Sequence, residues 1–368
     1  MDNLAERKVN RNAGKVVGAV FGNGALLLVT TVLVFLVFLV GVILVLTHGP
    51  SERAKYIFVN SCNETSALKF LPHWFLSDAE VEGLLASQSY TDTYVALGYR
   101  PDDNNVADIG EEQAALSMGD SEGAAVEGTA DDGFVDGIKI EDVTGETYRG
   151  KMMLIKDPSR VTIGVLGGYS ENGYGKFLYK FIEDYGAIGG VNGGGFADDE
   201  GKGKGGCPDG FVIKNGKIVY GENVGYCHNF VGFDADHNLM LRSCSARQAI
   251  NDGAVEGFTF EMGSVLIRDG NPSKKLGGGY NPRTAIGQCE DGTILLCVIE
   301  GRHAASLGAT RDDLVSIMTD YGAVNATMLD GGSSAEMRYD GEQLTRGSGL
   351  IGMRGLPNAV LVMPEDAD

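Results

Sequence analysis

The chain has 368 residues, a formal net charge of −20 and an isoelectric point near 4.6. So acidic a chain repels a phosphate backbone, which argues against a nucleic-acid partner. The 55 glycines are about twice the usual ~7% and show no collagen period, so they predict many tight turns, as is typical of β-rich folds.

An uncharged apolar run at residues 25–46 is long enough to cross a bilayer. Basic residues precede it and few follow, so the positive-inside rule places residues 1–24 in the cytoplasm and the rest of the chain outside. These basic residues are Arg7, Lys8, Arg11 and Lys15. We interpret the run as an uncleaved signal-anchor of a single-pass membrane protein. A cleaved signal peptide is the alternative, although no convincing cleavage site follows.

Residues 47–100 are expected to form a short helical juxtamembrane segment. Ser77, with Glu80 three residues later, predicts a capping box at the start of a helix. Residues 101–136 are acidic and small, cannot bury much apolar area, and therefore predict a disordered linker.

Six cysteines show no CxxC or Cys/His spacing that would indicate zinc, and we expect neither a metal nor a cofactor. Cys207 and Cys227 lie in glycine-rich sequence and can pair in an oxidising compartment.

A folded domain is predicted at residues 137–364. Hairpins are expected where strand-like runs flank turn residues, and two helices are expected at "GKFLYKFIEDYG" and "TRDDLVSIMTDYG". The predicted turns are Asn215-Gly216, Asp236-His237-Asn238, Asp291-Gly292 and Asp340-Gly341. This pattern indicates an α+β fold, with a mostly antiparallel sheet of hairpins and a few packed helices.

One acid follows a predicted buried strand in "MLDGGSSAEM", where Asp330 precedes two glycines and then Ser333 and Ser334. A carboxylate in this place is costly unless it is paired or functional. The glycines leave space beside it and the serines add hydroxyl groups. Aspartate also commonly caps turns, so the local sequence leaves a turn and an active-site acid equally open.

Other candidate residues also stand at predicted strand ends. The loop "VNGGGF" supplies Asn192, Gly193 and Gly194, and its backbone N–H groups can hold an anion, although a plain tight turn is the alternative. Arg283 opens a strand and can clamp a phosphate or carboxylate, or be a surface charge. Glu300 and Arg302 follow an apolar strand.

Taken in order, five segments of the domain resemble the phosphodiester glycosidase family. They are "VNGGGF", "PDGFVIKNGKIV", "RTAIGQCEDGTILLCVIEGR", "LVSIMTDYGAVNATMLDGGSSAEM" and "MRGLPNAVLV". The resemblance carries Asn192, Arg283, Asp330, Ser334 and Arg354 onto positions around the family's active site. Glu300 stands where the family often has Asp, and the glycine loop has one Gly more than the usual pattern.

The resemblance implies hydrolysis of a sugar-1-phosphodiester. Together with the outward-facing anchor, it predicts a substrate in an envelope glycan or exopolysaccharide. Its expected catalytic residues are Asp330, Glu300 and Arg283. Its expected substrate-binding residues are Asn192, Gly193, Gly194, Ser333, Ser334, Arg302 and Arg354. A non-catalytic carbohydrate- or wall-binding domain is an alternative, and an assembly scaffold joined through the membrane helix is another.

Overall fold

The computed structural model describes residues 26–65, 68–86, 133–198, 203–222, 228–260, 264–347 and 354–365. The basic residues before residue 26 and nearly all of the predicted acidic linker lie outside this set. Within it, Leu26–His48 is a 23-residue helix with a mean hydropathy of 3.2 over its most apolar window. Only 6% of that window is buried, so it is not a core helix. It is compatible with a signal-anchor or a single-pass membrane helix.

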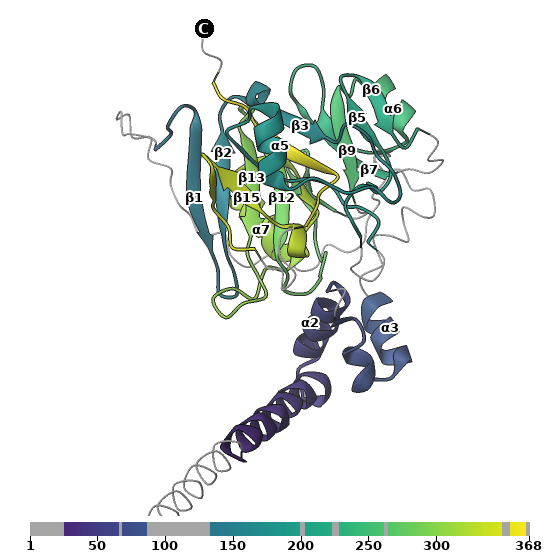
Figure 1. Ribbon diagram of the computed structural model, residues 1–368, viewed down its shortest axis with the longest axis vertical. Coiled ribbons are helices and arrows are strands. Elements are labelled where there is room, and N and C mark those ends of the chain that lie inside the picture. Colours follow the sequence, from purple (N-terminus) through teal and green to yellow (C-terminus); the bar gives the residue numbers. More distant parts are fainter. Residues whose placement is uncertain are drawn as a thin grey trace, which may run out of the picture.

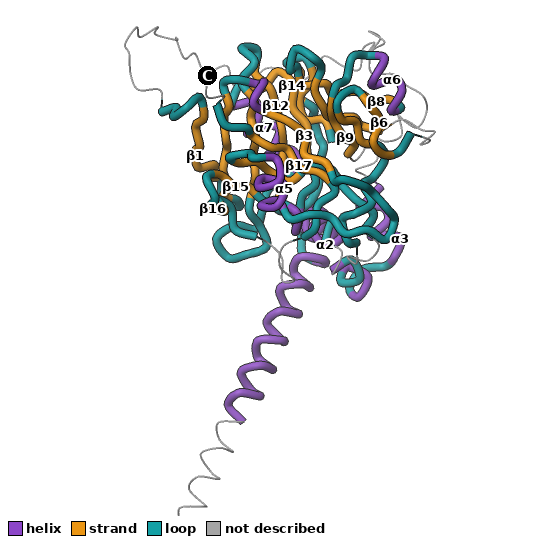
Figure 2. Tube along the Cα trace, turned by 45° about the horizontal axis from the view of Figure 1, so that its top comes forward, coloured by secondary structure: helices purple, strands orange, loops and turns teal. Residues whose placement is uncertain are grey.

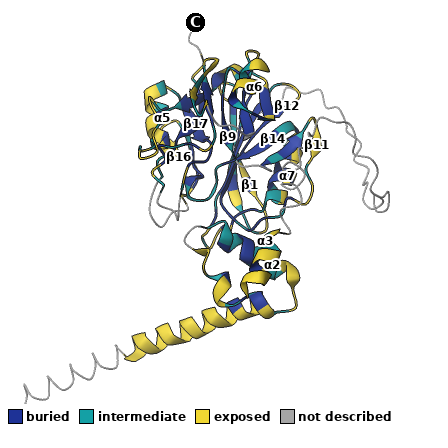
Figure 3. Cartoon of the chain, turned by 90° about the vertical axis from the view of Figure 1, so that its right-hand side faces the viewer, coloured by how far each residue is buried: buried dark blue, intermediate teal, exposed yellow. Residues whose placement is uncertain are grey.

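A small helical hairpin stands between this apolar helix and the β-sheets (Figures 1 and 3). It comprises α2 (Glu52–Asn63), the 3-10 turn η2 (Pro72–Trp74) and α3 (Asp78–Ala86). The predicted capping box is confirmed, because Glu80 Oε2 accepts from Ser77 N at 3.1 Å and Glu80 N donates to Ser77 Oγ at 3.4 Å. Val59, Leu76 and Val81 form the hairpin's own apolar core.

The β-strands form three antiparallel sheets. The first has the order β1 (Ile138–Thr144), β2 (Arg149–Ile155), β13 (Ile294–Ile299), β12 (Arg283–Cys289), β14 (Ala323–Leu329), β10 (Val265–Arg268), β11 (Asn271–Pro272). The second has the order β16 (Glu342–Gln343), β15 (Met337–Tyr339), β4 (Gly189–Asn192), β17 (Asn358–Val362), β3 (Val161–Val165). The third has the order β6 (Lys217–Tyr220), β5 (Val212–Lys214), β9 (Glu256–Phe260), β7 (His228–Phe233), β8 (Leu239–Cys244).

The main core lies between the sheets, and helices cover their outer faces (Figures 2 and 3). Successive side chains of a strand point to opposite faces, so β12 sends Ile286 into the central core and Ala285 into the layer beneath α7 (Arg311–Asp320). In the same way α5 (Leu178–Tyr185) packs on the second sheet and α6 (Ala246–Asn251) on the third. The 3-10 turn η3 (Pro158–Arg160) leads into β3. The α+β prediction is therefore correct.

The predicted local signals are confirmed in detail. The helix α5 ends at Gly186 in the left-handed conformation, and α7 begins at Thr310 with a capping box to Asp313. The four predicted hairpin turns occur where expected, with positive φ at Asn215 and Asp340, for example. The helix α6, capped by Ser245, was not anticipated. Cys207 is a free thiol, its sulfur 3.2 Å from the Tyr220 hydroxyl, and Cys227 lies outside the described residues.

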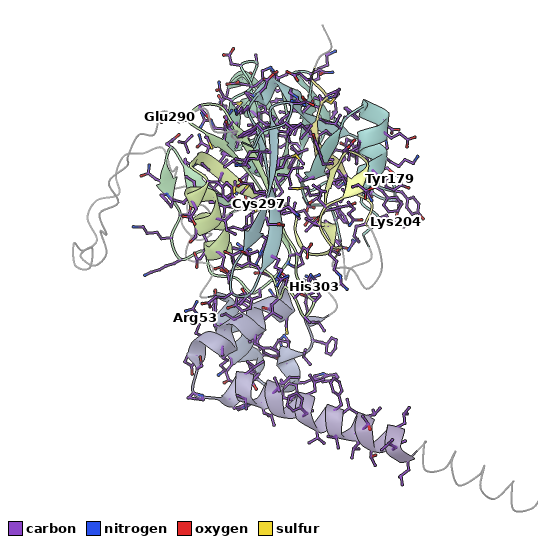
Figure 4. All side chains as sticks on the ribbon, turned by 90° about the vertical axis from the view of Figure 1, so that its left-hand side faces the viewer. Arg53, Tyr179, Lys204, Glu290, Cys297 and His303 are labelled. Atoms are coloured by element: carbon purple, nitrogen blue, oxygen red, sulfur yellow. The ribbon has the colours of Figure 1, made fainter. Side chains whose placement is uncertain are left out.

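The antiparallel register brings the candidate residues together where several strands end, and we call this end of the strands the site edge. Arg283 pairs with Ile299 and Thr284 pairs with Leu329, so the start of β12 lies beside the ends of β13 and β14. Asn192 ends β4 and pairs with Ala359 of β17. This edge is the one nearest the α2–α3 hairpin, as the labelled His303 just beyond β13 shows in Figure 4.

Candidate active site

Asp330 is the acid at the centre of this edge. Its backbone N–H donates to the Gly193 carbonyl at 3.0 Å, which ties the end of β14 to the glycine loop after β4. The Ser334 hydroxyl and the backbone N–H of Gly331 act on its carboxylate and lower its pKa. Ser333 and Ser334 lie in the 3-10 turn η5 (Gly332–Ser334), and Ser334 is buried. The break after β14 therefore turns the chain and surrounds one carboxylate with donors.

The protonation of Asp330 is strongly perturbed. Burial of the carboxyl group raises its pKa to about 7, against lowering effects from the Ser334 bond and from the charge of Arg354. The nearby charge of Asp209 raises it further. By its solvent-accessible surface the residue as a whole is only partly buried. A carboxyl group that titrates near neutral pH suits general acid or base work.

Asn192 and the glycine loop have positioning contacts. The Asn192 amide donates to the Asp330 carbonyl at 2.5 Å, and its oxygen accepts from Thr284 Oγ1 at 2.8 Å and from Glu336 N at 3.2 Å. The N–H groups of Gly193 and Gly194 donate to the backbone and side-chain oxygens of Asn358. In this arrangement these N–H groups hold the loop together instead of facing an open anion site.

Two arginines lie on the β12–β13 side of the site. Arg283 is buried and its Nη2 lies 2.6 Å from a carboxylate oxygen of Glu64 at the end of α2. Arg302 has a positive φ of 63°, which is strained for this residue type. Loss of hydration and the charge of Arg283 lower the pKa of Arg302, while Glu64 and Asp330 raise it. Arg302 therefore electrostatically links the Glu64–Arg283 pair with Asp330.

Arg354 approaches Asp330 from the segment before β17. Its guanidinium forms an ion pair with Asp198 at 2.9 Å, lies 5.0 Å from the centre of the Phe196 ring, and has Nη1 3.5 Å from Ser333 Oγ. Asp198 and Asp209 were missed in the sequence because each lies in an ordinary turn-like stretch. Asp209 and Asp330 are far apart in the sequence, so only the fold reveals that the charge of Asp209 acts on Asp330.

Glu300 has partners on the outer side of this edge. Its Oε1 accepts from the backbone N–H of Arg346 at 2.7 Å, and Oε2 lies 3.2 Å from His303 Nε2. These contacts fix the loop after β13, which carries Arg302. Across the described residues there is no cluster of three or more His, Cys, Asp or Glu side chains that could hold a metal ion.

The antiparallel α+β fold places one carboxyl group with a raised pKa beside Arg302 and Arg354. Residues 185–363, just under half of the chain, match the family model for phosphodiester glycosidases. All five segments that carried the resemblance lie in this range, and the resemblance is confirmed. The family supports a glycosidase-like hydrolase.

Individual relatives are distant. The SPbeta prophage-derived uncharacterized protein YomE of Bacillus subtilis (strain 168) is 30% identical over 131 residues, which are 34% of this chain and only 20% of that protein. The zebrafish N-acetylglucosamine-1-phosphodiester alpha-N-acetylglucosaminidase catalytic domain, auto-inhibited by its pro-peptide, is 20% identical, with a TM-score of 0.49 over 62% of this chain and 82% of that one. A hypothetical protein from Synechocystis is 16% identical, with a TM-score of 0.43 over 61% of each chain.

Proposed function

We propose that the chain is a hydrolase that cleaves a sugar-1-phosphodiester at the anomeric carbon. The observation that carries this proposal is the environment of Asp330, whose pKa is raised to about 7 beside the charge of Arg354, in a domain that matches phosphodiester glycosidases. The proposed substrate is a phosphate-containing glycan of the envelope or an exported polysaccharide. The proposed setting is outside the cell, with the chain anchored by the helix Leu26–His48 and with residues 101–136 linking hairpin and domain.

The chemistry requires an anion site and an activated water. Cleavage at the anomeric carbon expels a phosphate monoester, which is a weak base, so it needs less proton donation than an ordinary glycoside. Arginine side chains stabilise the negative charge that develops on the leaving group in the transition state. Asp330 orients and deprotonates the water, and a pKa near 7 lets it accept a proton at neutral pH and release it afterwards.

The other candidate residues divide by their contacts. Arg354 and Ser333 lie on one side of Asp330 and are proposed to hold the phosphate, together with Arg283 and Arg302. Ser334 bonds the Asp330 carboxylate and is proposed to hold it toward the water. Asn192, Gly193 and Gly194 act through the shape of the loop, and Glu300 acts by fixing the loop that carries Arg302.

The variant Asp330→Asn tests the proposal. The full-length protein is incubated with a panel of sugar phosphodiesters, and free sugar is identified as product. We expect Asp330→Asn to reduce release by at least about a hundredfold with the fold intact, because positioned acid–base groups contribute roughly 10²–10⁴-fold. Retained turnover would remove Asp330 from the mechanism. Glycan binding by the wild type without any turnover would favour a non-catalytic binding domain.

A further inference from the structure

Glu64, the residue that caps the C-terminal end of α2, reaches across to the candidate active site. Its Oε2 lies 2.6 Å from Arg283 Nη2 and 2.7 Å from Asn281 Nδ2, and its Oε1 accepts from the Gly279 N–H at 3.4 Å. The Glu64 side chain is 16% exposed and that of Arg283 is 11% exposed. The carboxylate is therefore largely enclosed by the catalytic domain.

Each group facing this carboxylate is a hydrogen-bond donor. They are a guanidinium, a side-chain amide N–H and a backbone N–H, the combination with which proteins bind carboxylate and phosphate oxygens. The Arg283 guanidinium is held in place, because its Nε donates to the Ala309 carbonyl at 3.1 Å and Nη2 to the Gly279 carbonyl at 2.9 Å. All of these donors belong to the β-sheet domain, and the helical hairpin contributes only the carboxylate.

The site adjoins Asp330. Arg302 Nη2 lies 3.1 Å from Asn281 Oδ1 and 3.5 Å from the Glu64 carbonyl oxygen. A Cβ on Gly332, two residues beyond Asp330, would lie 3.3 Å from the same Nη2. The Gly332 N–H also donates to the carbonyl of Pro282 at 2.9 Å. The anion site and the turn that follows the candidate catalytic acid Asp330 are therefore direct neighbours.

Two glycines make room for the occupant. Gly278 has a φ of +84°, and a Cβ there would lie 3.0 Å from Glu64 Oε1 and 3.2 Å from Arg283 Nη2. A Cβ on Gly279 would lie 2.2 Å from the backbone nitrogen of Ser61. Any other residue at these positions would fill the space that the Glu64 carboxylate and its helix end now take.

We propose that Gly279, Asn281, Arg283 and Arg302 form a phosphate subsite of the active site, and that Glu64 fills it in place of a substrate phosphate. The hairpin and an anionic substrate then compete for one site, and α2 withdraws when the substrate binds. The role of the phosphate as part of a sugar phosphodiester rests on the proposed function. The anion chemistry of the subsite does not.

Simple docking of the hairpin does not require this charge. Tyr280 N donates to Ser61 Oγ at 2.9 Å and Gly278 N donates to the Tyr56 hydroxyl at 3.3 Å, so uncharged contacts already attach α2. The Glu64 carboxylate adds an ion pair with Arg283, and its charge acts on Arg302 together with that of Asp330. A docking role predicts weaker attachment and no gain in ligand affinity when the charge is removed, whereas the subsite proposal predicts a gain.

The test uses the full-length protein in detergent and calorimetric titration with inorganic phosphate and with dimethyl phosphate. We expect Glu64→Gln to bind at least about tenfold more tightly than the wild type, because one charged competitor is removed. Adding Arg283→Met to Glu64→Gln should abolish this gain. Glu82→Gln, an exposed acid on α3, is the matched control and should bind like the wild type. A gain with dimethyl phosphate shows that the diester of a substrate fits, and a gain with inorganic phosphate alone assigns the subsite to the released monoester.

Unchanged or weaker phosphate binding by Glu64→Gln, relative to the wild type, would overturn the proposal. It would also be overturned if Glu64→Gln with Arg283→Met bound phosphate as tightly as Glu64→Gln alone. Hydrogen exchange of the wild type gives a second measurement that needs no substitution. Saturating phosphate should speed exchange of the amides at the end of α2, and unchanged exchange contradicts displacement. Glu64→Gln combined with Asp330→Asn should still bind phosphate. The subsite is therefore tested even if no sugar phosphodiester is ever turned over.

Discussion

The Asn192 side-chain amide donates to the Asp330 backbone carbonyl at 2.5 Å, across 138 residues of sequence. Asn192 is fully buried, and its oxygen accepts from Thr284 and Glu336. One side chain therefore links β4, β12 and the segment before β15 to the end of β14. This arrangement makes Asn192 a positioning residue that holds Asp330 in place through the backbone.

Replacing Asn192 by Ala should destabilise the domain and slow the reaction. It leaves one acceptor and two donors without a partner in the interior, which costs about 1–3 kcal/mol for each buried group. We expect a loss of at least about 3 kcal/mol in denaturant unfolding. We also expect a lower kcat with little change in KM, because the variant misplaces Asp330 and leaves the arginines in place.

The control is Asn271→Ala, whose exposed side-chain amide, at the start of β11, makes a local bond to the Asp269 carbonyl. This control should change both quantities little. If Asn192→Ala raised KM and left kcat and stability unchanged, Asn192 would be a substrate contact, as the family resemblance first implied.

The pH dependence of the reaction should report Asp330. If Asp330 acts as a base, kcat/KM rises with pH through about 7, the pKa set by its burial. Arg354 lowers this pKa, so Arg354→Met should move the acidic limb of the profile to higher pH. Arg247→Met, on an exposed pair with Glu222, should leave the limb in place. A limb that does not move would mean that another group controls the profile.

Stability should depend on pH through the same residue. The pKa of Asp330 rises from 3.8 in the unfolded chain to about 7 in the fold, so the stability it contributes is full below pH 4 and is lost as pH rises through 7. Asp330→Asn does not titrate and should become relatively more stable as pH increases. The resulting change in the free energy of unfolding, relative to Asp330→Asn, stays below about 4 kcal/mol, because solvent screens a partly exposed residue.

Urea unfolding of both proteins at pH 5 and pH 8 measures this effect. Asp236→Asn, at an exposed hairpin turn, should show the same difference from the wild type at both values. If the free energy of unfolding of Asp330→Asn, measured relative to that of the wild type, did not increase from pH 5 to pH 8, the raised pKa would be contradicted.

Local chemistry made much of the fold predictable. Turn pairs such as Asn215-Gly216 need positive φ, and caps such as Thr310 satisfy free N–H groups, so these signals act within a few residues. The order of strands in the sheets has no such local signal. For the same reason the ion pair of Glu64 with Arg283 and the effect of the Asp209 charge on the pKa of Asp330 could not be read from the sequence.

The site residues also differ in whether a local sequence signal or only the tertiary fold reveals their contacts. Asp330 and Arg283 were candidates because an acid after a buried strand is costly and an arginine at a strand start can clamp an anion. These local signals left a turn and a surface charge equally open, and the family resemblance singled the two residues out. The N–H groups of Gly193 and Gly194 were expected to face an anion, but in the fold they bond to Asn358, which is 164 residues away from Gly194. What a backbone N–H faces depends on the neighbouring strand, and that neighbour is set by tertiary packing.

The close packing around Gly194 gives a last prediction. A Cβ at Gly194 would lie 2.6 Å from the Thr259 carbonyl oxygen and 2.7 Å from the Phe258 ring, and both residues are fully packed in the third sheet. Gly194→Ala should therefore displace the loop after β4, with a cost of about 1–3 kcal/mol in unfolding and a fall in kcat as the contact between Gly193 and Asp330 shifts. Gly167→Ala is the control, because a Cβ there meets open space, and it should leave both quantities unchanged. Wild-type stability and kcat in Gly194→Ala would show that the loop tolerates a side chain and that its glycine has no steric role in holding Asp330.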